Sequence, residues 1–192
     1  MFGIAFRRRS SPVSLRGVGR FARVVSLAAA LAACSPAYNW RTVTNAADGY
    51  SIDLPAKPTV DERPVDIAGR PMTMKVQAAH AQGAVFAVGV IVLPGDDAQL
   101  RRTVADYVRT SLARNLGVAA EGRAVQVPLA AGGNVEGVAL ELSGAAGAGH
   151  EHKTLRAWIV ARGNHVYEAT LVAGEQPAQE QVDQFFQSFK LF

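Results

Sequence analysis

Residues 85–92 read VFAVGVIV, an apolar run with little alternation between apolar and polar side chains. A strand with one face in water would alternate, so this run indicates a strand in the middle of a sheet that is covered on both faces. Residues 72–79 precede it across the loop 80–83, which predicts a hairpin, and Pro94-Gly95 ends its second strand near residue 93. The rest of the chain is expected to assemble around this strand.

Short strands are predicted before this hairpin. Residues 40–44 and 50–54 flank a turn marked by Asp48-Gly49, and the second of them alternates between apolar and polar residues. Residues 60–67 form a weaker strand candidate. These segments point to antiparallel pairing.

A helix follows Pro94-Gly95. Asp96-Asp97 stands where a helix N-cap belongs, and Gly117 lies just past the expected end. Apolar residues recur between them at helical spacing: Leu100, Val104, Tyr107, Val108, Leu112 and Leu116. The charged residues fall mainly off this stripe and indicate a solvated face: Arg101, Arg102, Asp106, Arg109 and Arg114. A basic helix could also rest on anionic lipid, a less favoured reading because the stripe has ordinary core width.

The second half of the chain predicts more strands. Residues 123–127 and 138–142 are two of them, and a glycine-rich loop is expected at 144–149. Residues 154–162 and 165–173 then pair across Gly163-Asn164, a two-residue turn that admits positive φ. If Arg162 lies opposite His165, one shared face carries Trp158, Val160, Tyr167, Ala169 and Leu171, which we expect to face the core.

The C-terminal segment predicts a second helix with Pro177 near its start. Its apolar residues are Val182, Phe185, Phe186 and Phe189, and Lys190-Leu191-Phe192 follows. Together these elements predict an α+β fold, an antiparallel sheet flanked by helices, in a single domain over residues 40–192. Cys34 is the only cysteine, so packing and not a disulfide must stabilise the domain.

The N-terminal region differs from the rest in charge. The first 33 residues hold 6 of the 20 Lys and Arg and none of the 16 acids, which leaves the remainder at a net charge of −2. Basicity of the whole chain would suggest nucleic acid as a partner, but it resides in the leader. We therefore exclude nucleic-acid binding.

An apolar run in this leader ends at Leu31-Ala32-Ala33-Cys34, which looks like a bacterial lipobox. We interpret 1–33 as a lipoprotein signal peptide cleaved between Ala33 and Cys34, and 34–39 as the lipidated, palmitate-bearing cysteine with a short tether. The run of roughly 11 residues is too short to span a bilayer. An ordinary secretory signal cut after Ala30 or Ala32 remains open, but it would leave an unpaired thiol.

Three further segments carry a resemblance to a known fold: residues 49–55, 165–169 and 185–191. They resemble bacterial domains of the PsbP-like fold, and the resemblance spans most of residues 40–192. It implies an antiparallel sheet flanked by helices, as found in exported lipoproteins and in extrinsic photosystem II subunits, generally without enzymatic activity. It supplies no catalytic residues that transfer to this chain, and fold alone does not define function.

His150-Glu151-His152 is the best candidate metal site. Two histidines at i and i+2 on a strand point to the same side, but His165 lies at the far end of the same hairpin and His80 in an unrelated turn. We predict solvated histidines, with no metal and no cofactor.

Sequence signals for catalysis are absent. No Gly-x-Ser-x-Gly elbow or phosphate loop occurs, and the lipid would occupy Cys34. Asp96-Asp97 is read as a helix cap, and Glu168 as an acid at a sheet edge, with a pKa-shifted acid as the alternative. We expect no enzyme.

Two functions remain open. The favoured one is a non-catalytic cell-envelope lipoprotein on the periplasmic face of a membrane, which supports a protein complex or envelope maintenance through contact with an unknown protein. The alternative is a binder of a small apolar or lipidic ligand between sheet and helix. Ser35 stands where an aspartate would retain a lipoprotein at the inner membrane, so the outer membrane is expected.

Overall fold

A computed structural model describes residues 37–192 with the exception of residue 148. The predicted signal peptide, its cleavage point at Ala33 and the lipidation site Cys34 lie outside the described residues. In this described part, neither helix has the length and apolar character needed to cross a bilayer.

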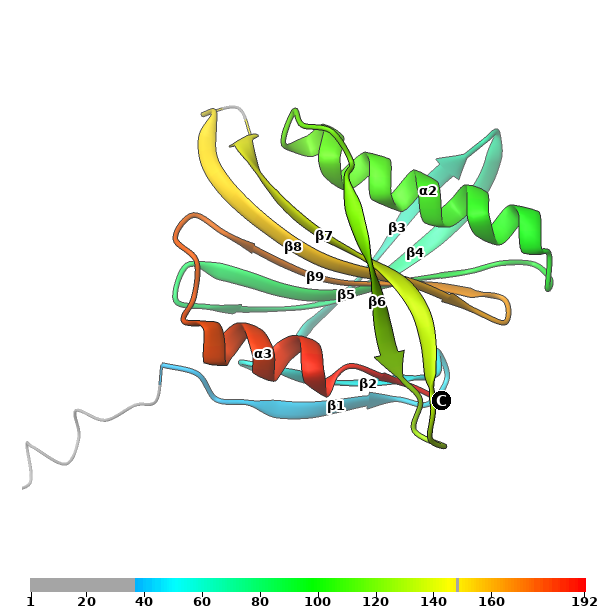
Figure 1. The fold of residues 1–192 in the computed structure, drawn as a ribbon, viewed down its shortest axis with the longest axis horizontal. Coiled ribbons are helices and arrows are strands. Elements are labelled where there is room, and N and C mark those ends of the chain that lie inside the picture. The colour runs from blue at the N-terminus through cyan, green and yellow to red at the C-terminus, as the bar shows by residue number, and fades with distance from the viewer. Residues whose placement is uncertain (1–36, 148) are drawn as a thin grey trace, which may run out of the picture. The chain divides into compact units, whose positions relative to one another are not determined.

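The fold is α+β and is built on a seven-stranded antiparallel sheet with the order β3-β4-β5-β9-β8-β7-β6 (Figure 1). The strands are β3 (Thr59–Ile67), β4 (Arg70–Ala81), β5 (Ala84–Val92), β6 (Gly122–Pro128), β7 (Asn134–Ala146), β8 (Glu151–Arg162) and β9 (His165–Ala173). Most neighbours in the sheet are also consecutive in the chain, so tight hairpins account for most of the pairing.

Strand β5 is central, as the apolar run predicts. It pairs with β4 on one side and β9 on the other, and most of its residues are buried, on both faces of the sheet. The β4–β5 hairpin is tighter than expected, because His80 and Ala81 belong to β4 and only Gln82-Gly83 forms the turn. Both turn residues have positive φ, the geometry that suits a two-residue hairpin loop.

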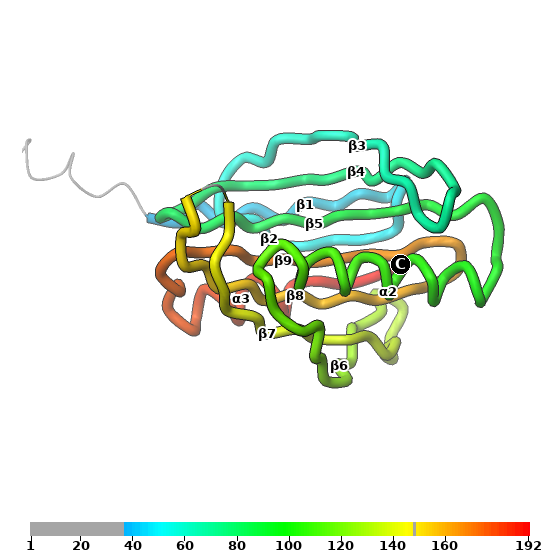
Figure 2. Tube along the Cα trace, turned by 90° about the horizontal axis from the view of Figure 1, so that it is seen from above, coloured from blue at the N-terminus to red at the C-terminus, as the bar shows by residue number. Residues whose placement is uncertain are grey.

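Helix α2 (Ala98–Asn115) covers one face of the sheet and runs over β8 and β9 (Figure 2). Asp97 caps it by accepting hydrogen bonds from the backbone N–H groups of Gln99 and Leu100. Its apolar stripe packs onto the sheet as predicted, through Leu100, Val104, Val108 and Leu116. A first core therefore lies between α2 and the sheet.

The opposite face is covered by helix α3 (Gln179–Ser188) and a second, three-stranded sheet with the order β1-β2-β10. Its strands are β1 (Arg41–Asn45), β2 (Tyr50–Leu54) and β10 (Lys190–Leu191). A second core lies here, with Tyr50, Phe86, Phe185 and Phe189 among its largest fully buried side chains.

The predicted register of the β8–β9 hairpin is confirmed: Arg162 lies opposite His165, Val160 opposite Tyr167 and Trp158 opposite Ala169. The predicted face belongs to the core shared with α3. The other face is buried as well, because α2 covers it, so Leu155, Ala157 and Ile159 are core residues too. Both faces of this hairpin are covered because it lies in the middle layer of a three-layer structure.

The glycine-rich loop predicted at 144–149 is shorter than expected. Strand β7 continues to Ala146, and β8 begins at Glu151. Gly144 lies inside the strand, where a Cβ would clash with the backbone carbonyl of Leu116 at the end of α2. This glycine therefore permits the close approach of helix and sheet and does not mark a loop.

The C-terminal strand β10 was not predicted, because two residues are too few to show periodicity. Lys190 and Leu191 pair with Ser51 and Tyr50 of β2. The backbone N–H of Ala130 also donates to the Leu191 carbonyl at 2.8 Å, which ties the end of β6 to the small sheet. The last residues of the chain thus join the two sheets.

Candidate functional site

The described chain is packed onto the domain almost from its first residue. Tyr38 stacks on Trp40 with ring centroids 5.8 Å apart, and both rings meet Phe86 edge-on. The indole N–H of Trp40 donates to Gln181 Oε1 at 3.1 Å. The start of the domain is therefore fixed at the end of the sheet where β5 begins.

The candidate metal residues do not come together. His150 lies in the turn before β8, and His152, at the beginning of β8, has its Nε2 3.2 Å from the Ser143 hydroxyl oxygen. His165 begins β9 and His80 lies near the end of β4. Within residues 37–192, apart from 148, no three metal-ligating side chains are grouped in a way that could hold an ion.

The carboxylates Asp96 and Asp97 both have structural partners. Asp96 pairs with Arg101. The Asp97 carboxylate accepts hydrogen bonds from two backbone N–H groups, and these bonds hold its pKa below the usual range. The cap interpretation of Asp97 therefore agrees with its contacts.

Glu168 does not lie at a sheet edge, contrary to the sequence-based expectation. Strand β9 runs between β5 and β8, and Glu168 pairs with Gly89 on one side and Ile159 on the other. Its aliphatic part and the Met74 side chain fill the room left by Gly89, where a Cβ would lie 2.9 Å from the Glu168 Cγ and closer still to the Met74 Cε. A central strand under α2 is a costly place for a carboxylate.

This placement changes the acidity of Glu168. The residue keeps some accessible surface, but protein surrounds its carboxyl group, and this burial raises the pKa to about 7. The Thr170 hydroxyl acts in the opposite direction, although by strict geometry it makes no regular hydrogen bond. The shifted-acid alternative is therefore the one the structure supports.

An apolar hollow on the described domain is a cleft of about 910 Å³, which we name the Lys75 cleft. Four segments border it: the β1–β2 turn, the β3–β4 hairpin, the end of β5 and the start of β9. Its lining residues are Ala47, Asp48, Pro64, Arg70, Pro71, Met72, Thr73, Lys75, Val92, Leu93, Pro94 and His165. The cleft is largely open to solvent, and more of its surface is apolar than polar.

Asp48 forms the polar base of the Lys75 cleft. The residue is 5% exposed, and its carboxylate accepts hydrogen bonds from Lys75 Nζ and from the Asn45 side-chain amide, each at 2.9 Å. The carboxylate raises the pKa of Lys75. The pair therefore fixes the β1–β2 turn against β4 and keeps an ammonium group at the cleft.

Two buried tyrosines lie behind this pair. Burial raises the pKa of Tyr50, and it raises the pKa of Tyr167 to about 12, with the Asp48 carboxylate adding to both shifts. Both phenols are therefore neutral at physiological pH and unsuited to accept a proton. His165 stacks on Tyr167 with ring centroids 5.6 Å apart, which holds its imidazole at the cleft.

Removal of the Lys75 ammonium should destabilise the domain. Lys75→Met leaves the Asp48 carboxylate buried with only Asn45 as its side-chain partner, at an expected cost of about 1–2 kcal/mol. The expected loss of stability is small because the Lys75 side chain is 42% exposed, so solvent screens the ion pair. Urea denaturation should show this loss for Lys75→Met and almost none for Lys57→Met, at an exposed lysine. Equal midpoints for the two variants would contradict a structural role for the pair.

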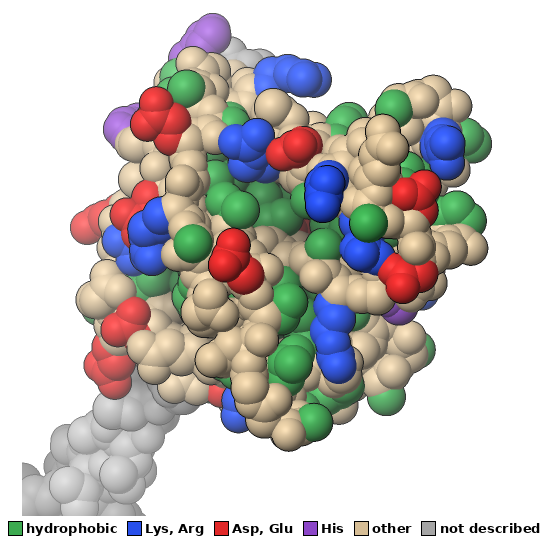
Figure 3. Space-filling model, turned by 45° about the vertical axis from the view of Figure 1, so that its right-hand side comes forward, with side chains coloured by type: hydrophobic (Ala, Val, Ile, Leu, Met, Phe, Trp, Pro, Cys, Tyr) green, Lys and Arg blue, Asp and Glu red, His purple; other side chains and the backbone are tan. Residues whose placement is uncertain are grey.

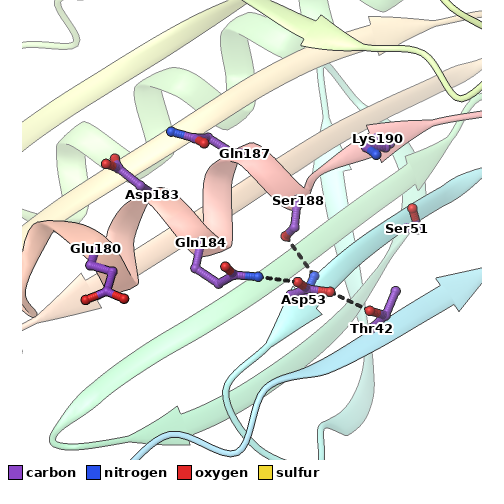
Figure 4. A pocket seen from close by; sticks show the side chains of 9 residues that line it. All are labelled: Thr42, Ser51, Asp53, Glu180, Asp183, Gln184, Gln187, Ser188 and Lys190. Atoms are coloured by element: carbon purple, nitrogen blue, oxygen red, sulfur yellow. Dashed lines mark hydrogen bonds between the residues drawn. The ribbon is translucent and has the colours of Figure 1, made fainter.

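A second groove, of about 820 Å³, lies between α3 and the β1–β2 hairpin and is lined mainly by polar side chains (Figure 4). Asp53 is its centre: its carboxylate accepts from Thr42 Oγ1 at 2.6 Å and from the Gln184 amide, and its backbone N–H donates to Ser188 Oγ. Glu180 and Asp183 of α3 also line the groove. The charged residues of the groove are acidic apart from Lys190. The hydrogen bonds in the groove hold α3 to β2.

Space between the sheet and either helix is limited. Two hollows lie there, of about 140 Å³ beside α3 and about 160 Å³ beside α2. Ligand pockets usually measure about 300–1,000 Å³. The interior beneath the helices is filled by the two cores, and the larger hollows are at the surface.

The surface charge is mixed. Figure 3 shows hydrophobic side chains between charged side chains of both signs, with no large patch of one sign on that face.

The sequence pointed to the turn at Asp48-Gly49, but nothing in it signalled that Asp48 is buried or that Lys75 reaches it. That pair joins residues 27 positions apart, a contact that periodicity cannot reveal.

Comparison with solved structures shows a distant likeness. No protein-family model matches the sequence, and no curated protein sequence matches it either. A crystal structure of a protein from Bacteroides thetaiotaomicron VPI-5482 is similar with a TM-score of 0.42 and 8% sequence identity, over 74% of this chain and 45% of that protein. The chain thus spans less than half the length of that protein.

Proposed function

We propose that this chain is an exported lipoprotein in which acylated Cys34 holds a non-catalytic α+β domain beside a membrane, where the domain acts through contact with another protein. The proposal places the domain on the periplasmic side, at the outer membrane in preference to the inner one, because Ser35 follows the cysteine. The resemblance to PsbP-like domains is part of it, and an antiparallel sheet covered on both faces is compatible with that resemblance.

The observation that carries the proposal is the packing of Tyr38 and Trp40 on Phe86. Only Ser35, Pro36 and Ala37 separate Cys34 from Tyr38, and four Cα steps reach at most about 14 Å. A lipid on Cys34 would therefore keep the domain against the headgroups.

The same packing determines which end of an anchored domain would face the bilayer. Tyr38 lies near Phe86 at the start of β5, and the Lys75 cleft includes Val92 at its end. Six residues of strand correspond to about 20 Å. An anchored domain would therefore present the Lys75 cleft away from the bilayer, where a partner in the periplasm can reach it.

The positions of the titratable groups support a non-catalytic role. Asp48, Asp97 and Lys75 are engaged in contacts that hold turns and a helix end, and Glu168 lies on a central strand of the sheet. The alternative function, a small apolar ligand between sheet and helix, has less support because the hollows there measure only about 140 and 160 Å³.

Extraction of native membranes with a mild detergent tests the proposal. The tagged full-length protein should migrate on a native gel above the size of the monomer in its micelle, and one partner should co-purify in a fixed ratio. Cys34→Ala should abolish both the membrane fraction and the complex. A monomeric species that carries lipid but no partner would contradict the contact function.

A further inference from the structure

We propose that the Lys75 cleft binds a small organic anion with an apolar body, such as a medium-chain carboxylate. This inference goes beyond the proposed function and does not depend on the lipid anchor. It rests on the position of cationic groups beside an apolar surface at the same end of the domain.

The side of the cleft that suits an anion comes from three side chains, of which Arg70 and Lys75 are cationic. Arg70 and Lys75 lie on β4, and His165 begins β9. Among the lining residues the opposing charge is Asp48, which Lys75 and Asn45 already engage. The lining therefore has an excess of positive charge, with N–H groups that match a carboxylate.

Other charged groups lie near the cleft without lining it. Glu62 adds to the raised pKa of Lys75 and Asp97 lies near Arg70, but neither lines the cleft, and Asp97 accepts from two backbone N–H groups. Arg162, opposite His165, has a buried guanidinium nitrogen with no hydrogen-bond partner among the described residues. It adds a further positive charge on the strand next to His165.

The apolar side of the cleft is formed by prolines and aliphatic residues. Met72 and Val92 keep part of their surface exposed, and Pro71 and Pro94 lie beside them. Proline and methionine offer apolar surface without hydrogen-bond donors, so this side suits a hydrocarbon chain. An anion with such a chain can use both sides at once, whereas acetate or an uncharged alcohol can use only one.

Titrations monitored by NMR test the inference. Residues 37–192, which form a compact unit with their own cores, are titrated with sodium octanoate, and amide shifts should concentrate on residues lining the Lys75 cleft. Octanoate should bind at least ten-fold more tightly than octanol, which lacks the charge, and than acetate, which lacks the chain. Amide shifts from octanol equal to those from octanoate would overturn the proposed recognition of an anion. Shifts confined to residues outside the Lys75 cleft would overturn the assignment of binding to this cleft.

Matched variants assign the cationic groups. Arg70→Gln leaves the Asp48–Lys75 pair intact and should weaken octanoate binding several-fold, while Arg114→Gln, at an exposed arginine of α2, should leave it unchanged. Lys75→Gln should weaken binding further, compared with Lys57→Gln. Unchanged affinity in Arg70→Gln and Lys75→Gln, with native amide spectra, would overturn the proposal.

Discussion

Removal of residues 182–192 should leave a polypeptide that does not fold cooperatively. This segment contains most of α3 and all of β10, and its apolar side chains are at the centre of one core: Val182, Phe185, Phe186, Phe189 and Leu191. Phe185, Phe189 and Leu191 have no exposed surface. Each such side chain contributes about 1.5–3 kcal/mol by burial, so the loss is comparable to a total stability of about 5–15 kcal/mol.

Circular dichroism during heating measures this effect. The chain ending at Gln181 should show no sharp transition and no near-ultraviolet signal. Two substitutions serve as a matched pair: Phe185→Ala should cost about 3–5 kcal/mol, and Phe192→Ala, at a side chain that is 45% exposed, should cost less than about 1 kcal/mol. A truncated product that melts cooperatively would show that the sheet folds without this cover.

Glu168→Gln should change how stability depends on pH. The folded-state pKa is about 7, and the unfolded value is near the ordinary 4.5, so the folded state binds more protons between these values. The stability of the wild-type protein therefore includes a contribution that is fully present below pH 4.5 and is lost as the pH rises to about 7. The full span corresponds to roughly 3 kcal/mol.

The glutamine variant stays neutral at every pH and should lose this dependence. Near pH 8, urea denaturation should find Glu168→Gln more stable than wild type by about 2–3 kcal/mol, and near pH 4 the two should be alike. Glu136→Gln, at an exposed position on β7, should follow the wild-type curve. If the stability of wild type and of Glu168→Gln varied with pH in parallel, the Glu168 carboxyl would not be the source of the pH dependence.

Elements with a local signal could be predicted from the sequence. Asp97 and Gly117 mark the ends of α2, and Gly163-Asn164 sets the β8–β9 register residue by residue. The unbroken apolar run at 85–92 indicated a central strand, which the pairing of β5 with β4 and β9 confirms. In each case the determining residues lie within one element or one turn.

Features that depend on distant segments were missed. The second buried face of β8 follows from α2 lying over it, and β10 forms only because β2 offers a free edge. Glu168 looked like an edge residue because a charged side chain is unexpected in the middle of a sheet. The candidate site has the same origin, since Asp48, Lys75 and His165 come from three separate segments and meet only in the folded domain.

The central claim is that a lipid on Cys34 anchors this domain, and mass spectrometry of the mature N-terminal peptide tests it most directly. The account predicts a peptide that begins at Cys34 and carries thioether-linked acyl chains, with wild-type protein in the membrane fraction and Cys34→Ala released from it. A bare thiol on Cys34, or an unchanged distribution of Cys34→Ala, would contradict the claim.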